Sequence, residues 1–370
     1  MMDNTSAAIR HDPDALQSRT ISYLRFLMAF AVVLLHASNA GAKGDLPVYS
    51  TMCILLGEGL CRIAVPCFFL ISGYLFFKGL ASWDWSVWGT KLRRRVHTLL
   101  IPYLLWNVLA AVLIYGYHWL RVRVGNGEPE ALAAITSQWG PGGWRILWDC
   151  EKGMPLDYPL WFIRNLIFYT LATPLIYAFC KYLKGAGILL LGILLFGFLH
   201  WQENLFFYAA GAWLSLSGRN MLTAFHRFRW PAVALSLILL CCLPWAYRHD
   251  PTAYYYLLKS FILCGCVAAF ALTGSGLRRG VLHDHPFLTR SAFFIFAAHG
   301  ILILDDIARY VMLHLTAARD EFYYCADVVV RTVVTIALCL ALYRVLERFF
   351  PRLGNVLTGA KSRQSNGAKG

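Results

Sequence analysis

Residues 21–40 read ISYLRFLMAFAVVLLHASNA, an apolar stretch that contains two ionisable side chains. Its length matches the roughly 20 residues that an α-helix needs to cross about 30 Å of hydrocarbon. Arg25 and His36 are eleven positions apart, and on a helix of about 3.6 residues per turn this spacing returns to the same face within about 20°. We therefore expect a membrane helix that presents a cation and an imidazole on one face.

Similar apolar segments recur along the whole chain. Its 370 residues are 58% hydrophobic and 15% charged, with a mean hydropathy of +0.53, whereas soluble domains are about 45–50% apolar. This composition argues against a water-soluble monomer. About ten segments have the length and composition of membrane spans. They lie near residues 21–40, 60–77, 98–117, 159–180, 185–199, 205–216, 231–247, 254–273, 291–304 and 326–346.

The predicted fold is therefore an all-α, polytopic membrane helix bundle of about ten transmembrane helices. The two short segments 185–199 and 205–216 form either two spans or one re-entrant pair. Only short gaps separate most segments, and no linker rich in proline, serine or charge divides the chain. One integral membrane domain explains this pattern better than two or three soluble domains do.

The distribution of basic residues predicts the orientation in the membrane. The formal net charge is +14, and the basic side chains lie mostly in the gaps between apolar segments, which is typical of a cytoplasmic membrane face rather than of a nucleic-acid-binding surface. Alternate gaps hold about 19 and about 8 Lys and Arg residues, so both termini are predicted to be cytoplasmic. We expect a tail at 1–20, a membrane domain at 21–350 and a tail at 351–370. The large outer loop at 118–158 is either functional or a tolerated insertion.

Two further segments carry candidate functional residues. Residues 65–74, VPCFFLISGY, place Ser72 and Gly73 at about the depth of Arg25. Small residues of this kind usually serve close helix packing, and no G-x-S-x-G motif surrounds the serine. The following gap ends in three consecutive arginines, Arg93, Arg94 and Arg95. They either satisfy the positive-inside rule or bind phosphates, which guanidinium groups hold through paired hydrogen bonds.

Later segments add five candidates. Trp161 and Arg164 enter the fourth segment, and Trp161 is also suited to anchor the helix at the membrane interface. His299 lies about midway through the ninth segment. A polar side chain at this depth either takes part in the function or forms a hydrogen bond between helices. Asp327 and Arg331 are spaced i, i+4 and are predicted to pair on one helix face, as a structural lock. The cysteines lie mainly in apolar runs without zinc-ligand spacing, so we expect neither a metal site nor a disulfide framework.

Through these residues taken together, the sequence resembles the membrane acyltransferase 3 family. Its members are bacterial multi-spanning O-acyltransferases that modify cell-surface glycans. The resemblance extends over about residues 22–352. Arg25 and His36 resemble the family's Arg-x10-His signature, and residues 65–74 resemble its VPxFFxISGY segment. Further matches are the basic run that leads into Ile101-Pro102, the segment 159–164 and the late segment 343–348. The family usually has an aspartate just before the Leu-Arg of its first motif, where this chain has Ser22 and Tyr23.

The resemblance implies transfer of an acetyl or similar short acyl group from cytoplasmic acyl-CoA to a hydroxyl of a cell-surface carbohydrate or its lipid-linked precursor. It implies a multi-pass location in the plasma membrane, here the bacterial inner membrane, with acetyl-CoA as co-substrate, no permanently bound cofactor and no nucleic acid. The expected partners are acyl-CoA, a carbohydrate acceptor and the lipid bilayer. The expected catalytic residues are His36 and Arg25. The donor site is expected to comprise Arg93, Arg94, Arg95, Ser72 and Gly73, and the oxyanion or acceptor site is expected among Arg164, His299 and Trp161.

A different class of function remains open at this point. A multi-pass exporter or flippase for an anionic or glycan substrate would also carry buried cations, and it would line its path with Arg25, Arg62, Arg164 and Arg331. Internal repeats are common in transporters, and the two halves of this sequence show none.

Overall fold

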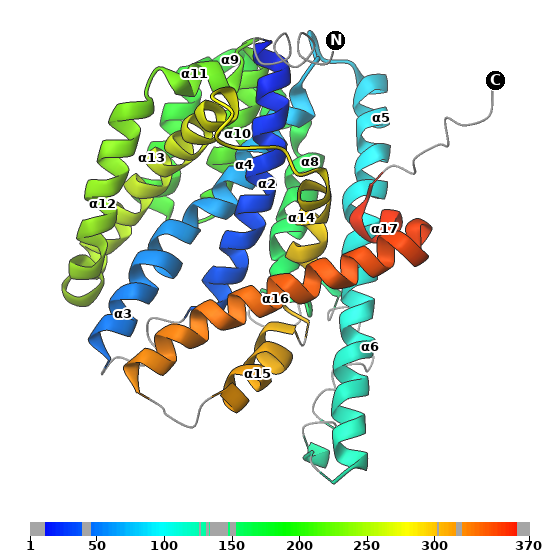
Figure 1. Ribbon diagram of the computed structural model, residues 1–370. Helices are drawn as coiled ribbons and strands as arrows, with labels where there is room; N and C mark the ends of the chain where they lie inside the picture. The colour runs from blue at the N-terminus through cyan, green and yellow to red at the C-terminus, as the bar shows by residue number, and fades with distance from the viewer. Residues whose placement is uncertain are drawn as a thin grey trace, which may run out of the picture. The chain divides into compact units, whose positions relative to one another are not determined.

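A computed structural model of the chain describes residues 12–38, 46–125, 127–130, 133, 147–148, 153–301, 303–315 and 320–360. The regular elements in these ranges are helices (Figure 1), which confirms the expected all-α class. They divide between two compact units, and α14, α15 and α16 each contribute residues to both. The first unit comprises Met1–Asp84, Ala172–Ala292 and Met312–Val333, and the second comprises Trp85–Leu171, Phe293–Val311 and Val334–Gly370.

The first unit is built from helices that pack in pairs: α2 with α4 and α13, α10 with α4 and α9, and α12 with α13. Its elements are α2 (Pro13–Ala37), α3 (Pro47–Cys53), the π-helical η1 (Ile54–Gly59), the 3-10 helix η2 (Leu60–Ile63), α4 (Ala64–Phe77), α9 (Thr173–Gly192), the π-helical η6 (Ile193–Leu199), α10 (Asn204–Leu216), α11 (Met221–His226), α12 (Arg229–His249), α13 (Pro251–Arg278), the start of α14 (Pro286–Ala298), the end of α15 (Ala308–Leu315) and the first part of α16 (Glu321–Phe349).

The second unit contains a helix that runs on through three elements, from the basic segment into the third apolar segment. Its elements are α5 (Trp85–Arg95), the π-helical η3 (Val96–Leu100), α6 (Ile101–Arg123), the 3-10 helix η5 (Tyr158–Leu160), α8 (Trp161–Leu171), the end of α14 (Pro286–Ala298), the π-helical η7 (Ile303–Ile307), the start of α15 (Ala308–Leu315), the rest of α16 and α17 (Pro351–Thr358).

Seven helices within the described residues are long and apolar enough to cross a membrane, and the number is eight if the bent pair Pro286–Ala298 and Ile303–Met312 counts as one span. This is fewer than the ten expected. The difference arises because α8 and α10, of 11 and 13 residues, are too short to qualify alone. In addition, Thr173–Leu199 counts as one helix although it is interrupted at Lys184, whose φ of 50° and ψ of −141° are not helical. That interruption separates the segments predicted at 159–180 and 185–199.

The helix boundaries extend beyond the predicted membrane domain at both ends. α2 begins at Pro13, where Asp12 accepts a capping bond from the backbone N–H of Asp14 at 2.9 Å, so residues 13–20 are helical. Proline at the first helical position loses no hydrogen bond there, and a side-chain oxygen at the cap satisfies a backbone donor. Residues 351–358, also expected in a tail, form α17. Its Leu357 carbonyl accepts a hydrogen bond from the Trp106 indole of α6 at 2.9 Å.

The VPCFFLISGY segment forms α4, and its glycine serves a close crossing with α10. A methyl group added at Gly73 would collide with the backbone carbonyl of Tyr208, and one added at Gly211 would collide with the backbone carbonyl of Leu70. The two glycines therefore lie against each other's helix backbone. This is the packing use of small residues that is common in membrane helices, and it gives Gly73 a structural role whether or not it also contacts a donor.

We predict that Gly211→Ala lowers the stability of the protein, because the extra methyl group overpacks the crossing of α4 and α10 at a cost of about 1–3 kcal/mol. Gly89→Ala is the matched control, since an added Cβ there meets no atom within 4 Å and alanine favours a helix over glycine by about 1 kcal/mol. Thermal unfolding in detergent, followed by fluorescence, should show a lower midpoint for Gly211→Ala alone. Equal midpoints for both variants would contradict the close crossing.

Candidate functional site

The side chains of Arg25 and His36 project from the same face of α2, as predicted, because the helix is continuous from Pro13 to Ala37. Arg25 is exposed and His36 is half-buried. Ser22 and Ser18 lie on this face one and two turns before Arg25, respectively, and are also exposed. The first unit therefore carries a polar stripe along α2, with a guanidinium near its middle and an imidazole in its last turn.

The end of α2 that carries His36 is held by hydrogen bonds to two consecutive residues. The guanidinium of Arg331, in α16, donates from Nη2 to the backbone carbonyl of Ala37 at 2.6 Å. The next residue, Ser38, caps the helix: its N–H donates to Leu34 O at 3.1 Å and its hydroxyl donates to Leu35 O at 2.9 Å. The backbone on both sides of His36 is therefore engaged.

The predicted ion pair between Asp327 and Arg331 is present in α16. Arg331 Nε lies 2.9 Å from Asp327 Oδ2, and both side chains are mostly buried. The structural role expected for the pair is thus supported by a contact within one helix. The bond from Arg331 to Ala37 was not predicted, because the two residues are 294 positions apart in sequence and no local pattern links them.

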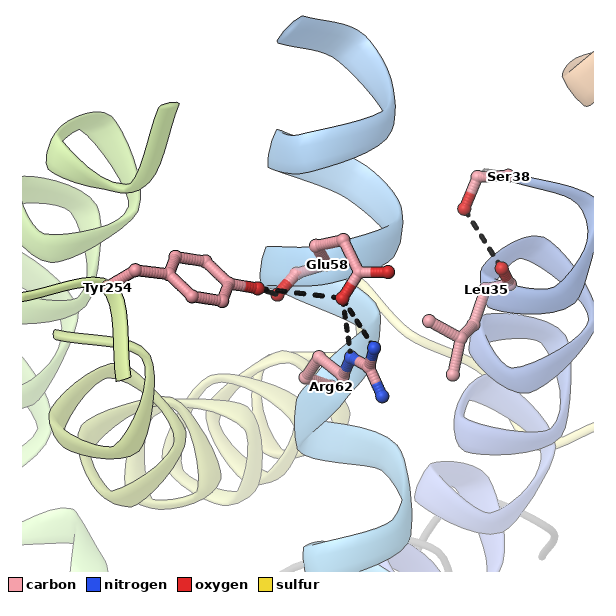
Figure 2. A network of polar contacts seen from close by, with 5 residues as sticks. All are labelled: Leu35, Ser38, Glu58, Arg62 and Tyr254. Atoms are coloured by element: carbon pink, nitrogen blue, oxygen red, sulfur yellow. Dashed lines mark hydrogen bonds and ion pairs between the residues drawn. The ribbon is translucent and has the colours of Figure 1, made fainter. Parts of the chain in front are cut away.

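A second ion pair of the same kind joins Glu58 of the π-helical η1 to Arg62 of the 3-10 helix η2, just before α4 (Figure 2). Arg62 Nε lies 3.1 Å from Glu58 Oε2, and the Tyr254 hydroxyl of α13 approaches that carboxylate at 3.5 Å and the Glu58 backbone carbonyl at 3.4 Å. Gly57, in the same segment, faces Ser38, so that an added methyl group would collide with the serine hydroxyl. Short π-helical stretches are often found at functional sites.

The basic segment forms α5 in the second unit. Arg93 and Arg94 are exposed and Arg95 is half-buried. Consecutive helical residues point about 100° apart, so the three arginines do not share one face, whereas Lys91, Arg94 and Arg95 do. Lys91 is therefore a further cation of this face that the sequence analysis did not single out, although its i, i+3 and i, i+4 spacing was available as a signal. Ser72, on α4, is half-buried and belongs to the first unit.

Arg164, one turn into α8, holds the segment that precedes the helix. Its Nη1 donates to Trp148 O at 2.7 Å and its Nη2 donates to Gly153 O at 2.7 Å. Trp161 is half-buried at the first position of α8. Two donors of the Arg164 guanidinium are therefore committed to backbone carbonyls, which supports a structural role for this residue.

His299 lies at the bend between α14 and η7, where the two helices meet at 82°. It is fully buried, and its Nδ1 lies 2.8 Å from Phe296 O and 3.1 Å from Ile295 O. Because carbonyl oxygens only accept hydrogen bonds, Nδ1 carries a proton, so that in a neutral ring Nε2 is the accepting nitrogen. The Tyr158 ring packs edge-on at a centroid distance of 6.4 Å.

Asp157 adds a buried carboxyl group to the second unit. Its side chain is 2% exposed, and among the described residues neither carboxylate oxygen has a hydrogen-bond partner. Its backbone N–H donates to Asn107 Oδ1 at 3.1 Å, and Asn107 is itself fully buried. An aspartate before a proline-containing helix start usually caps the helix, and here it makes no such bond. Burial in this apolar surrounding raises the pKa of Asp157 well above its ordinary value.

We predict a pH-dependent stability term from Asp157. Between the ordinary pKa of about 4 and its raised folded-state pKa, the folded protein holds a proton that the unfolded chain has lost, so stability falls by about 1.4 kcal/mol per pH unit as pH rises through that interval. Asp157→Asn should remove this slope and raise the unfolding midpoint at pH 8. The control variant Asp306→Asn, in the same unit, should leave both the slope and the midpoint unchanged. Thermal unfolding from pH 5 to 8 measures both. A lower midpoint for Asp157→Asn at pH 8 would show instead that the carboxylate is ionised and stabilising.

Comparison with known proteins identifies the kind of protein to which these residues belong. The chain matches the acyltransferase 3 family, described as an acyltransferase domain, over residues 19–344. It is 26% identical over 376 residues to the succinoglycan biosynthesis protein ExoH of Rhizobium meliloti (strain 1021), with 94% of each chain covered. No solved structure matches it. Because the match includes all the candidate residues and most of the chain, this multi-pass membrane protein belongs to the acyltransferase 3 family.

Proposed function

We propose that this protein is an integral-membrane O-acyltransferase that moves an acetyl or similar short acyl group from cytoplasmic acyl-CoA to a hydroxyl of a cell-surface carbohydrate or its lipid-linked precursor. The observation that carries the proposal is the shared face of Arg25 and His36 on α2, in a chain of the acyltransferase 3 family. The similarity to a protein named for succinoglycan biosynthesis supports a glycan acceptor. The proposed location is the bacterial inner membrane, with both termini cytoplasmic.

In the proposed reaction, His36 acts as general base. Its neutral imidazole takes the proton of the acceptor hydroxyl as the oxygen attacks the thioester carbonyl carbon. Collapse of the tetrahedral intermediate breaks the carbon–sulfur bond, and the leaving thiolate takes the proton from the imidazolium. The products are an O-acyl ester and free coenzyme A, and no acyl-enzyme is required.

Cationic side chains would bind the acyl-CoA donor at more than one point along its length. Arg93, Arg94 and Arg95, with Lys91 on the face shared by Arg94 and Arg95, are suited to the phosphates of the nucleotide, because guanidinium groups bind phosphate oxygens bidentately. Arg25 would bind the donor further along, and the exposed serines of the same stripe, Ser18 and Ser22, add hydrogen-bonding capacity. Ser72 remains a proposed neighbour of the donor.

The oxyanion of the tetrahedral intermediate needs hydrogen-bond donors that are fixed before the reaction. His299 and Arg164 are less suited to that task than their residue types suggest, since His299 Nδ1 and two nitrogens of Arg164 already donate to backbone carbonyls. A neutral His299 would instead accept a hydrogen bond through Nε2, which suits a hydroxyl of the acceptor. Trp161 retains its indole N–H and ring as proposed acceptor contacts.

The proposal is tested by acyl transfer from labelled acetyl-CoA to surface or lipid-linked glycans in membranes with and without the protein. His36→Ala and His36→Gln should lower the rate by about 10²–10⁴, the usual contribution of a general base, with little change in expression or thermal stability. An interhelical hydrogen bond in a bilayer contributes only about 0.6 kcal/mol. His118→Gln, a histidine replacement on α6, is the matched control. Near wild-type transfer by His36→Gln would move the search for the base to His299.

The donor assignment has a separate test. Replacing Arg93, Arg94 and Arg95 together by glutamine should raise the apparent KM for acetyl-CoA at least tenfold, equivalent to the loss of about 1.4 kcal/mol of binding. The double variant Arg121→Gln/Arg123→Gln removes arginines from the far end of α6 and should leave that KM unchanged. An unchanged KM for the triple variant in correctly inserted protein would restrict the three arginines to setting topology.

A further inference from the structure

The Arg331 side chain of α16 bonds the last turn of α2 from outside the helix. Its guanidinium bonds the Ala37 carbonyl at 2.6 Å and Asp327 at 2.9 Å, through different nitrogens. Ala37 follows His36 directly and is buried. The position of the His36 backbone is therefore coupled to α16 through this bond.

The geometry of this contact goes beyond what an ion pair within one helix requires. Asp327 and Arg331 satisfy each other's charge on α16 without any help from α2. Their side chains are only 18% and 12% exposed, and a desolvated pair of this kind is orientated by the hydrogen bonds around it. A second nitrogen of the guanidinium, Nη2, then donates to the Ala37 carbonyl in the last turn of α2, where the partial negative charge of the helix end favours a cation.

Two other contacts limit how the end of α2 can move. The Ser38 hydroxyl donates to Leu35 O at 2.9 Å, on the other side of His36. Gly57 of the π-helical segment lies so close to Ser38 that it leaves no space for a methyl group. The end of α2 is thus bounded by η1 at Ser38 and bonded to α16 at Ala37.

We propose that Arg331, orientated by Asp327, is a positioning residue that fixes the imidazole of His36 for proton transfer. This inference rests on the proposed function, in which His36 is the general base. The guanidinium itself takes no part in bond making. It holds the backbone from which His36 projects, and a displacement of about 1 Å at a reacting group can reduce the rate about 10²-fold.

The first test compares Arg331→Gln with Arg19→Gln. Arg19 forms an ion pair with Asp284 at the opposite end of the same helix, so its replacement removes a comparable interaction far from His36. We expect Arg331→Gln to lower kcat per folded protein about 10- to 100-fold, with an apparent KM for acetyl-CoA within about twofold of wild type. Arg19→Gln should retain the wild-type kcat. A wild-type kcat for Arg331→Gln overturns the inference, as does a loss explained entirely by less folded protein.

The second test separates positioning from helix locking. The exchanged pair Asp327→Arg/Arg331→Asp keeps an i, i+4 ion pair on α16 but places a carboxylate opposite the Ala37 carbonyl. We expect its kcat to fall at least as far as that of Arg331→Gln. Wild-type kcat in the exchanged variant would mean that the pair only locks α16, and it would overturn the inference. If the exchanged variant does not fold, the kcat and KM of Arg331→Gln decide whether the inference holds.

Failure of this inference is distinguishable from failure of the proposed function. If the His36→Gln protein is active, His36 is not the general base. Arg331 then has no base to position, whatever the Arg331 variants do. Inactive His36→Gln together with a wild-type kcat for Arg331→Gln would leave His36 as the base and overturn the positioning role alone.

Discussion

The interior of a bilayer offers no water to backbone N–H and C=O groups, and this constraint keeps α2 helical throughout its length despite Arg25 and His36. A continuous helix fixes the angle between side chains, so eleven residues bring these two groups to one face. The polar stripe on α2 therefore follows from satisfied backbone hydrogen bonds. The interruption at Lys184, in contrast, occurs where a lysine and two nearby glycines allow the backbone to leave the helix.

Two ion pairs of the first unit share one arrangement. Glu58 with Arg62, and Asp327 with Arg331, are each spaced one turn apart on their own helical segment, and each pair also bonds a neighbouring helix. The outside partner is the Tyr254 hydroxyl for the first pair and the Ala37 carbonyl for the second. Local neutralisation lowers the cost of keeping the charges in an apolar surrounding. The contact to a second helix then fixes how the two helices are placed relative to each other.

Sequence reasoning predicted those features whose cause lies within one helix. The shared face of Arg25 and His36 follows from their spacing, and the pair Asp327–Arg331 follows from an i, i+4 rule. The bond from Arg331 to Ala37, the crossing of Gly73 with Tyr208, and the burial of Asp157 depend on which helices meet, and no periodicity encodes that. The number of spans was harder to predict for a related reason. Short helices such as α8 and α10 carry enough apolar residues to be recognised but are not long enough to cross alone.

The pairing of the arginines also bears on the choice between an enzyme and a carrier. A carrier for an anionic substrate needs cations that can exchange their counter-ion during transport. Arg62 and Arg331 already have a carboxylate one turn away, and Arg164 donates to two backbone carbonyls. A substrate anion would have to displace these partners. At the mostly buried pair of Arg331 and Asp327 it would leave a carboxylate uncompensated, and breaking a buried pair in this way typically costs about 3–5 kcal/mol. These three arginines are therefore built to hold the protein's own groups in place, which suits a fixed catalytic framework better than a transport path.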